Sequence, residues 1–144
     1  MIDDLIRTNK NYSYAGNVLG GVGSDPILSS ITNSINININ FATQSATAVI
    51  DFTTLRGTVW NAEFSTNTNL FDRANGYRYT INGASGTVKM AGSNPNEKMI
   101  NGAGSQLQGH FYGDEAKSTG GRFQLNGQDY GTANGVFKAR RVSP

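Results

Sequence analysis

Three glycine-bounded aromatic segments in the last third of the chain indicate its fold: Gly109-His110-Phe111-Tyr112-Gly113, Gly120-Gly121-Arg122-Phe123 and Gly135-Val136-Phe137-Lys138-Ala139-Arg140-Arg141. Aromatic residues favour strands, and the flanking glycines favour turns. An aromatic pair followed by Gly113 predicts a buried strand that ends in a turn with positive φ, which only glycine adopts without strain. The basic C-terminal segment predicts a last strand that closes a sheet.

The clearest periodicity lies further upstream, at residues 35–41, where the sequence reads Ile-Asn-Ile-Asn-Ile-Asn-Phe. A period of two places the apolar side chains on one face of a strand and the polar ones on the other. The same alternation recurs in residues 47–54 and 58–64. Asn82-Gly83 is a strong signal for a tight turn between two further strands.

These strands predict an all-β domain: a soluble, eight-stranded antiparallel up-and-down β-barrel. One apolar face per strand requires a single layer curled around its own core, and about eight strands enclose a space that side chains fill. A small β-sandwich is the alternative that the strand pattern leaves open. An outer-membrane barrel is disfavoured, because the aromatic residues are scattered along the strands and form no girdles near the strand ends. The expected core includes Ile35, Ile37, Ile39, Phe41, Trp60, Phe111, Phe123 and Phe137.

Length and composition are those of one exported β domain. A chain of 144 residues fits a single domain, with residues 1–11 as a lead-in or linker remnant and residues 12–144 as the barrel. The 18 glycines and the charged fraction of 15% suit a β protein with many turns. A net charge of +2 provides no strong field for nucleic acid, so none is expected as a partner. No apolar run approaches the roughly 20 residues of a membrane helix, so no transmembrane segment is expected.

The sequence contains few residues suited to catalysis or metal binding. Cysteine is absent, which excludes disulfides, cysteine-based zinc sites and thiol nucleophiles. The acids Asp114 and Glu115 are adjacent, so their side chains point in different directions and do not suit general acid–base catalysis. We therefore expect no enzyme, no catalytic residue and no bound metal.

His110 is the single histidine of the chain. In a strand it shares one face with the polar side chains of Gln106 and Gln108. We interpret it as a partly exposed residue of the outer face, and the alternative is a haem or metal ligand. Accordingly, we predict that His110→Ala leaves the fold intact and changes any ligand affinity by less than about tenfold.

Partner contacts are expected in the long loops at residues 24–33, 65–76 and 91–104, which exceed the roughly two to five residues of an ordinary hairpin connection. Loops held by a rigid scaffold commonly carry binding residues. The expected partner-binding side chains are Leu70, Phe71, Arg73 and Met99. On this interpretation, alanine at Phe71 or Arg73 weakens binding and costs under about 1 kcal/mol of stability. The alternative is a lid that packs over an open barrel end.

The three C-terminal segments resemble the barrel of the transferrin-binding protein B family, which comprises surface lipoproteins of Gram-negative bacteria with relatives such as factor H-binding protein and the secreted haemophilins. The departures include Asp114, where the family pattern has proline, and Lys138, where it has glycine. The matching positions are Gly109, Phe111, Tyr112, Gly113, Ala116, Gly120, Gly121, Phe123, Val136, Phe137, Ala139 and Arg141.

The resemblance implies a non-enzymatic barrel domain of a bacterial surface or secreted protein that binds a ligand or partner in iron or haem acquisition. The implied partners are a host iron- or haem-carrying protein, together with an outer-membrane receptor or a surface-export translocon. The resemblance implies no cofactor for this chain, with haem allowed in a longer parent protein. One alternative is a module that binds a host complement regulator, and a second is a structural scaffold that supports export or a separate handle domain. The family's lipid-anchor cysteine and an apolar signal are not in this sequence, so we expect either a domain of a longer protein or an export signal that lies elsewhere.

Overall fold

The computed structural model describes residues 1–29, 33–67, 70–92 and 96–142. Its helical elements are α1 (Ile2–Arg7) and the 3-10 turns η1 (Arg73–Asn75), η2 (Asp114–Ala116) and η3 (Gln128–Tyr130). The strands are β1 (Asn11–Val22), β2 (Asp25–Pro26), β3 (Asn33–Asn40), β4 (Ser45–Thr53), β5 (Thr58–Thr66), β6 (Phe71–Asp72), β7 (Arg78–Asn82), β8 (Ala84–Met90), β9 (Lys98–Met99), β10 (Asn101–Tyr112), β11 (Ser118–Asn126) and β12 (Thr132–Arg141).

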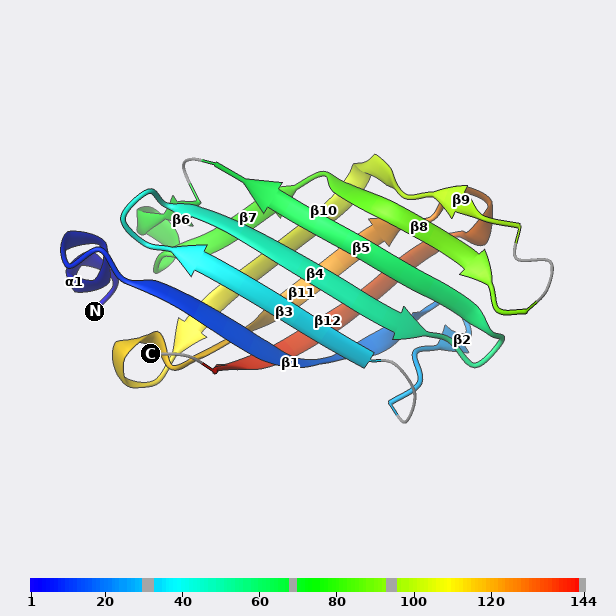
Figure 1. Ribbon diagram of the computed structural model, residues 1–144, viewed down its shortest axis with the longest axis horizontal. Coiled ribbons are helices and arrows are strands. Elements are labelled where there is room, and N and C mark those ends of the chain that lie inside the picture. Colours follow the sequence, from blue (N-terminus) through cyan, green and yellow to red (C-terminus); the bar gives the residue numbers. More distant parts are fainter. Residues whose placement is uncertain (30–32, 68–69, 93–95, 143–144) are drawn as a thin grey trace.

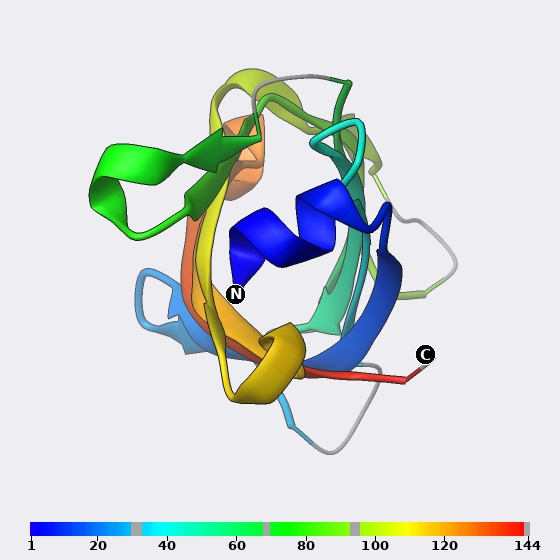
Figure 2. The same cartoon turned by 90° about the vertical axis from the view of Figure 1, so that its left-hand side faces the viewer.

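All strands belong to one sheet, in the order β6-β7-β10-β11-β12-β1-β3-β4-β5-β8-β9, with β2 paired to β1. Every strand pairing is antiparallel, so the prediction of an all-β antiparallel fold is confirmed. The sheet curls around its own apolar face, as the two views show (Figures 1 and 2). The sheet has 12 strands where eight were expected. The difference arises partly because the short strands β2 and β6 lie in segments that were predicted as loops.

Asn82-Gly83 is not the hairpin turn that the sequence suggested. The strand β7 before it pairs with β10, and β8 after it pairs with β5, so the two do not pair with each other. Gly83 has φ of 83°, and its N–H donates to the carbonyl of Ser105 at 2.9 Å. A single residue between two strands leaves no room for the chain to reverse. The positive φ instead bends one extended segment so that its two halves have different neighbours.

The core contains the alternating residues that the sequence indicated. Seven of the eight expected core residues are buried, and Phe111 is half-buried. The Phe111 ring still packs inward, with its centroid 5.1 Å from that of Tyr79 and 5.5 Å from that of Phe41. Cross-strand packing of apolar faces, such as Trp60 on Phe52 with centroids 5.5 Å apart, stabilises the curled sheet.

Glycines on the inner face make room for the rings. A Cβ atom at Gly109 would lie 2.5 Å from the Tyr79 ring, and one at Gly135 would lie 2.5 Å from the Phe123 ring. Such contacts are shorter than packed atoms allow, so these positions accept glycine only. Gly113 has φ of 77°, which confirms the predicted positive-φ turn after β10.

The N-terminal residues form a helix, α1, that lies across one end of the curled sheet (Figure 2). Ile2 and Leu5, on one side of this helix, are buried in the core. Asp3 and Asp4 in its first turn complement the helix dipole. Residues 1–11, expected as a lead-in, thus contribute apolar side chains to the core. Among the described residues, no helix is long or apolar enough to cross a membrane.

All three predicted loops contain more regular structure than expected, with β2 inside 24–33. Strand β6 lies within 65–76, and β9 and the start of β10 lie within 91–104. Residues 30–32, 68–69 and 93–95, which belong to the three predicted loops, lie outside the described residues.

Candidate binding surface

The predicted partner-binding residues lie at opposite ends of the fold. Phe71 and Arg73 belong to the β6–η1 segment beside α1 and Leu70 directly precedes it, whereas Met99 belongs to β9 at the far end (Figure 1). The sequence pattern predicted that all four lie in loops, but it did not reveal which loops lie at the same end of the sheet. The structure therefore brings three of them together and separates the fourth.

Leu70 and Phe71 pack against the core. Leu70 is buried, and its N–H donates to the carbonyl of Gln44 at 3.2 Å. The half-buried Phe71 stacks on Phe41 with centroids 5.5 Å apart, and its centroid is 5.9 Å from that of Phe111. These contacts correspond to the lid that the sequence offered as its alternative. A direct role of these two side chains in binding remains a prediction.

Arg73 is exposed and joins the β6–η1 segment to α1. Its guanidinium donates to Asp3 Oδ1 at 2.5 Å and lies over the Tyr77 ring, with 5.3 Å from Cζ to the ring centroid. The Tyr77 hydroxyl donates to the other carboxylate oxygen of Asp3. These hydrogen bonds, from Tyr77 first and Arg73 second, lower the pKa of the Asp3 carboxyl. We call Asp3, Arg73 and Tyr77 the helix clamp. Sequence reasoning missed it, because Asp3 is 70 residues from Arg73.

Met99 and His110 are exposed side chains away from the helix clamp. Met99 is 60% exposed, and its backbone carbonyl accepts a hydrogen bond from Gln128 Nε2 at 2.6 Å. His110 lies on the outer face of β10 and is exposed, which agrees with the interpretation of its strand face. Among the residues that the structure describes, no group of three or more His, Cys, Asp or Glu side chains is placed to hold a metal ion.

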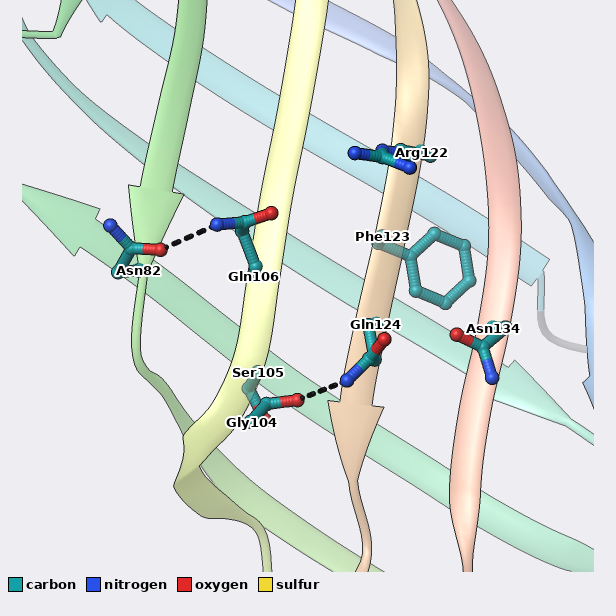
Figure 3. Close-up of a pocket in the computed structure, with 8 residues that line it drawn as sticks. All are labelled: Asn82, Gly104, Ser105, Gln106, Arg122, Phe123, Gln124 and Asn134. Atoms are coloured by element: carbon teal, nitrogen blue, oxygen red, sulfur yellow. Dashed lines mark hydrogen bonds between the residues drawn. The ribbon is translucent and has the colours of Figure 1, made fainter.

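A polar hollow of about 340 Å³ lies on the outer face of β7, β10, β11 and β12 (Figure 3). Gln106 Nε2 donates to Asn82 Oδ1 at 2.8 Å, and Gln124 Nε2 donates to the carbonyl of Gly104 at 2.9 Å. The Arg122 guanidinium adds a positive charge at its edge (Figure 3). The hollow offers amide donors and acceptors but no carboxylate or imidazole for proton transfer. It is suited to binding by hydrogen bonds.

The buried hydroxyls serve the fold. The Tyr79 hydroxyl shares a hydrogen bond of 2.5 Å with the Thr119 hydroxyl, and the Tyr14 hydroxyl donates to the carbonyl of Ala116 at 2.5 Å. Burial raises the pKa of both phenols above the ordinary value. Both groups therefore stay protonated and act as donors that tie the strands to η2 and β11.

The residues of this fold match one family of protein domains over nearly the whole chain. The family, described as the C-lobe and N-lobe beta barrels of Tf-binding protein B, matches residues 6–141. The chain belongs to this family. This match confirms the resemblance seen in the C-terminal segments and places the chain in a family of binding proteins, not of enzymes.

Similar solved structures are distant in sequence. The chain is 17% identical to isotype 1 transferrin-binding protein B of serogroup B Neisseria meningitidis over 92% of its length, with a TM-score of 0.46. It is 17% identical to a surface lipoprotein over 92% of its length, with a TM-score of 0.49. It is 16% identical to a variant of transferrin-binding protein B of Haemophilus parasuis Hp5 over 94% of its length, with a TM-score of 0.43.

The chain spans 26% of each of the two transferrin-binding proteins and 62% of the surface lipoprotein. No curated protein sequence matches it. The family match, and not these distant likenesses, carries the assignment.

Proposed function

We propose that this domain binds a host iron-carrying protein of the transferrin kind, as part of a bacterial surface protein that acquires iron. The observation that supports the proposal is the match of residues 6–141 to the barrels of a protein named for binding transferrin. In this proposal the domain performs no catalysis. The rigid sheet presents loop ends and outer faces to the partner, as scaffolds with binding loops commonly do.

We also infer that the sheet is a closed barrel of eight long strands. Gly83 alone separates β7 from β8, and Ile100 alone separates β9 from β10. The segment made of β7 and β8 therefore runs beside the segment made of β9 and β10: β7 pairs with β10, and β8 pairs with β9. These two pairings involve both ends of the strand order, so they join the ends and close the sheet. In support, the Ile100 N–H donates to the carbonyl of Gly86 at 2.9 Å between the two paired stretches.

A scaffold role is the second candidate function, and the positions of Leu70 and Phe71 favour it. Both were expected as free anchors, yet Leu70 is buried and Phe71 stacks on the core ring of Phe41. Two of the four expected anchors thus stabilise the barrel end. In the scaffold reading, a different part of a longer protein contacts the partner, and this domain holds that part in place.

The test is direct binding of the isolated chain. The immobilised chain is exposed to iron-loaded and iron-free human transferrin, and haem is titrated separately with absorbance as the readout. We expect saturable binding of transferrin. A folded chain that binds neither form of transferrin contradicts the proposal and favours the scaffold, and a haem absorption band without transferrin binding assigns haem as the ligand instead.

Two exposed methionines provide a matched pair for locating that contact. Met99 is 60% exposed in β9, and Met90 is 37% exposed at the end of β8. If the loop ends bind the partner as predicted, Met99→Ser weakens transferrin binding and Met90→Ser does not. Equal affinities for the two variants would remove Met99 from the contact.

A further inference from the structure

Three exposed apolar side chains lie on the outer face of the C-terminal half of the sheet, and two of them meet. Leu19 of β1 and Val136 of β12 stand directly opposite each other in the strand register. They are 61% and 53% exposed, and Tyr112 at the end of β10 is 56% exposed. Apolar side chains that meet on a surface, unlike single scattered ones, indicate an interaction site.

Two hollows flank β12 on this face. The larger, of about 700 Å³, lies over β1 and β12 and is lined by Leu19, Val136, Lys138 and Arg140 among others. The smaller, of about 380 Å³, lies towards β11 and is lined by Tyr112, Gly120 and Lys138 among others. Gly120 has no side chain to fill the space beside the Tyr112 ring. Lys138 therefore stands between two recesses that apolar side chains of a partner can enter.

The charged side chains that point outward from these strands all have one sign, while the exposed Asp114 and Glu115 lie beyond the end of β10, in η2. Arg122 of β11 and Lys138 and Arg140 of β12 are exposed. The outward positions of β10, β11, β12 and β1, which alternate with the buried ones, include no Asp or Glu. In the described part of the chain, the salt bridges between side chains involve four other cations, on Arg7, Arg73, Arg78 and Lys98. None of these three cations forms one of those salt bridges; Arg122 Nε donates to the neutral Gln108 Oε1 at 3.2 Å, so all three keep a positive charge for an anionic partner.

We propose that this surface, defined by Leu19, Tyr112, Arg122, Val136, Lys138 and Arg140 and called here the β12 face, binds an acidic, apolar segment of a partner protein. Carboxylates of the segment pair with the three cations, and its apolar side chains enter the hollows beside Val136 and Tyr112. Complementary charge directs such an encounter, and the apolar contacts hold it. Both β1 and β12 are hydrogen-bonded on both sides, so the segment lies on the face and adds no strand.

A protein segment fits this face better than nucleic acid or membrane. The aliphatic side chains of Leu19 and Val136 lie beside Lys138 and Arg140. A site for nucleic acid would have further cations or aromatic side chains at these two positions, to bind phosphates or stack on bases. Three cations are also fewer than the roughly four to eight of a lipid-binding basic cluster. The inference rests on the proposed function as a partner-binding domain and assigns a surface to it.

The test uses a fluorescent peptide in which Glu and Leu alternate, with anisotropy as the readout. We expect the native chain to bind it, and both Val136→Ser and Lys138→Glu to weaken binding by at least about tenfold. The matched controls are Val49→Ser and Lys89→Glu, which change the same residue types on the outer faces of β4 and β8. We expect the controls to bind within about twofold of the native chain.

Several outcomes overturn the inference. These are no binding of the peptide, equal weakening by the controls, and tighter binding of single-stranded DNA or phosphatidylserine vesicles that is lost in the same two variants. A dimer in sedimentation that Val136→Ser dissociates would assign the face to a second copy of the chain. If the native chain and both β12-face variants bind transferrin equally but no form binds the peptide, the inference fails while the proposed function stands.

Discussion

The two halves of the sheet share one interior but differ on the outside. The outer face of β3, β4, β5 and β8 presents mostly Asn, Thr and Ser, with the half-buried Val49 and Val59 and with both signs of charge, on Asp51, Glu63 and Lys89. The β12 face presents cations and exposed apolar side chains with no carboxylate. The inner faces of both halves are apolar and buried in one core. The two halves therefore contribute alike to the core and differ in the side chains that they present to solvent.

The largest expected effect tests the shared interior. Phe52 of β4 and Phe123 of β11 come from opposite halves, and their ring centroids are 6.0 Å apart in the core. We expect Phe52→Ala and Phe123→Ala each to lower the free energy of unfolding by about 3–5 kcal/mol, because each leaves a cavity. Urea unfolding followed by tryptophan fluorescence measures both. A loss under about 1 kcal/mol in one half only would show that the two halves do not share a core.

The next effect concerns the end of the barrel near α1. Phe71 is half-buried between Phe41 and Phe111, so Phe71→Ala loses ring contacts but leaves a site that solvent reaches. We expect a loss of about 1–2 kcal/mol, which is more than the cost of under about 1 kcal/mol that a free surface anchor predicts. The same variant is tested for transferrin binding. Unchanged stability with weakened binding would restore Phe71 as an anchor and contradict the lid.

A smaller effect depends on pH and tests the helix clamp. Hydrogen bonds from Tyr77 and Arg73 lower the pKa of Asp3 in the folded state, so ionised Asp3 stabilises the fold. That contribution is present above the unfolded pKa of about 4 and is lost as the pH falls through the lower folded value. We therefore expect Asp3→Asn to have a lower Tm than the native chain near about pH 7 and the same Tm near about pH 2. Asp4→Asn is the control, since Asp4 bonds to Arg7 within the helix. A Tm difference independent of pH would exclude the charge of Asp3 as its cause.

The smallest effect is expected on the outer face of β10. His110 is exposed, so His110→Ala should leave the Tm nearly unchanged and alter any ligand affinity by less than about tenfold, or about 1.4 kcal/mol. Thermal melting and haem titration measure the two quantities. Loss of a haem absorption band in this variant would prove His110 to be a ligand and would extend the binding surface beyond the β12 face.

Much of the fold follows from local sequence rules. Alternation over 35–41 placed Ile35, Ile37 and Ile39 in the core, and the position of Gly113 after an aromatic pair predicted its positive φ. The same rules failed at Asn82-Gly83, because a turn signal does not reveal with which strands the two flanking segments pair. They also failed to show that Phe71 packs inward, because its contacts with Phe41 and Phe111 come from distant strands.

The sequence by itself determined the strands, their inner faces and the family, because side-chain alternation and glycine turns are properties of neighbouring residues. Only the tertiary structure decided which residues share a surface. The Leu19–Val136 pair of the β12 face, the Asp3–Arg73–Tyr77 helix clamp and the Tyr14–Ala116 hydrogen bond each join distant parts of the chain, the last across 102 residues. Such pairs depend on the register and curl of the whole sheet, to which many strands contribute and which no short segment encodes.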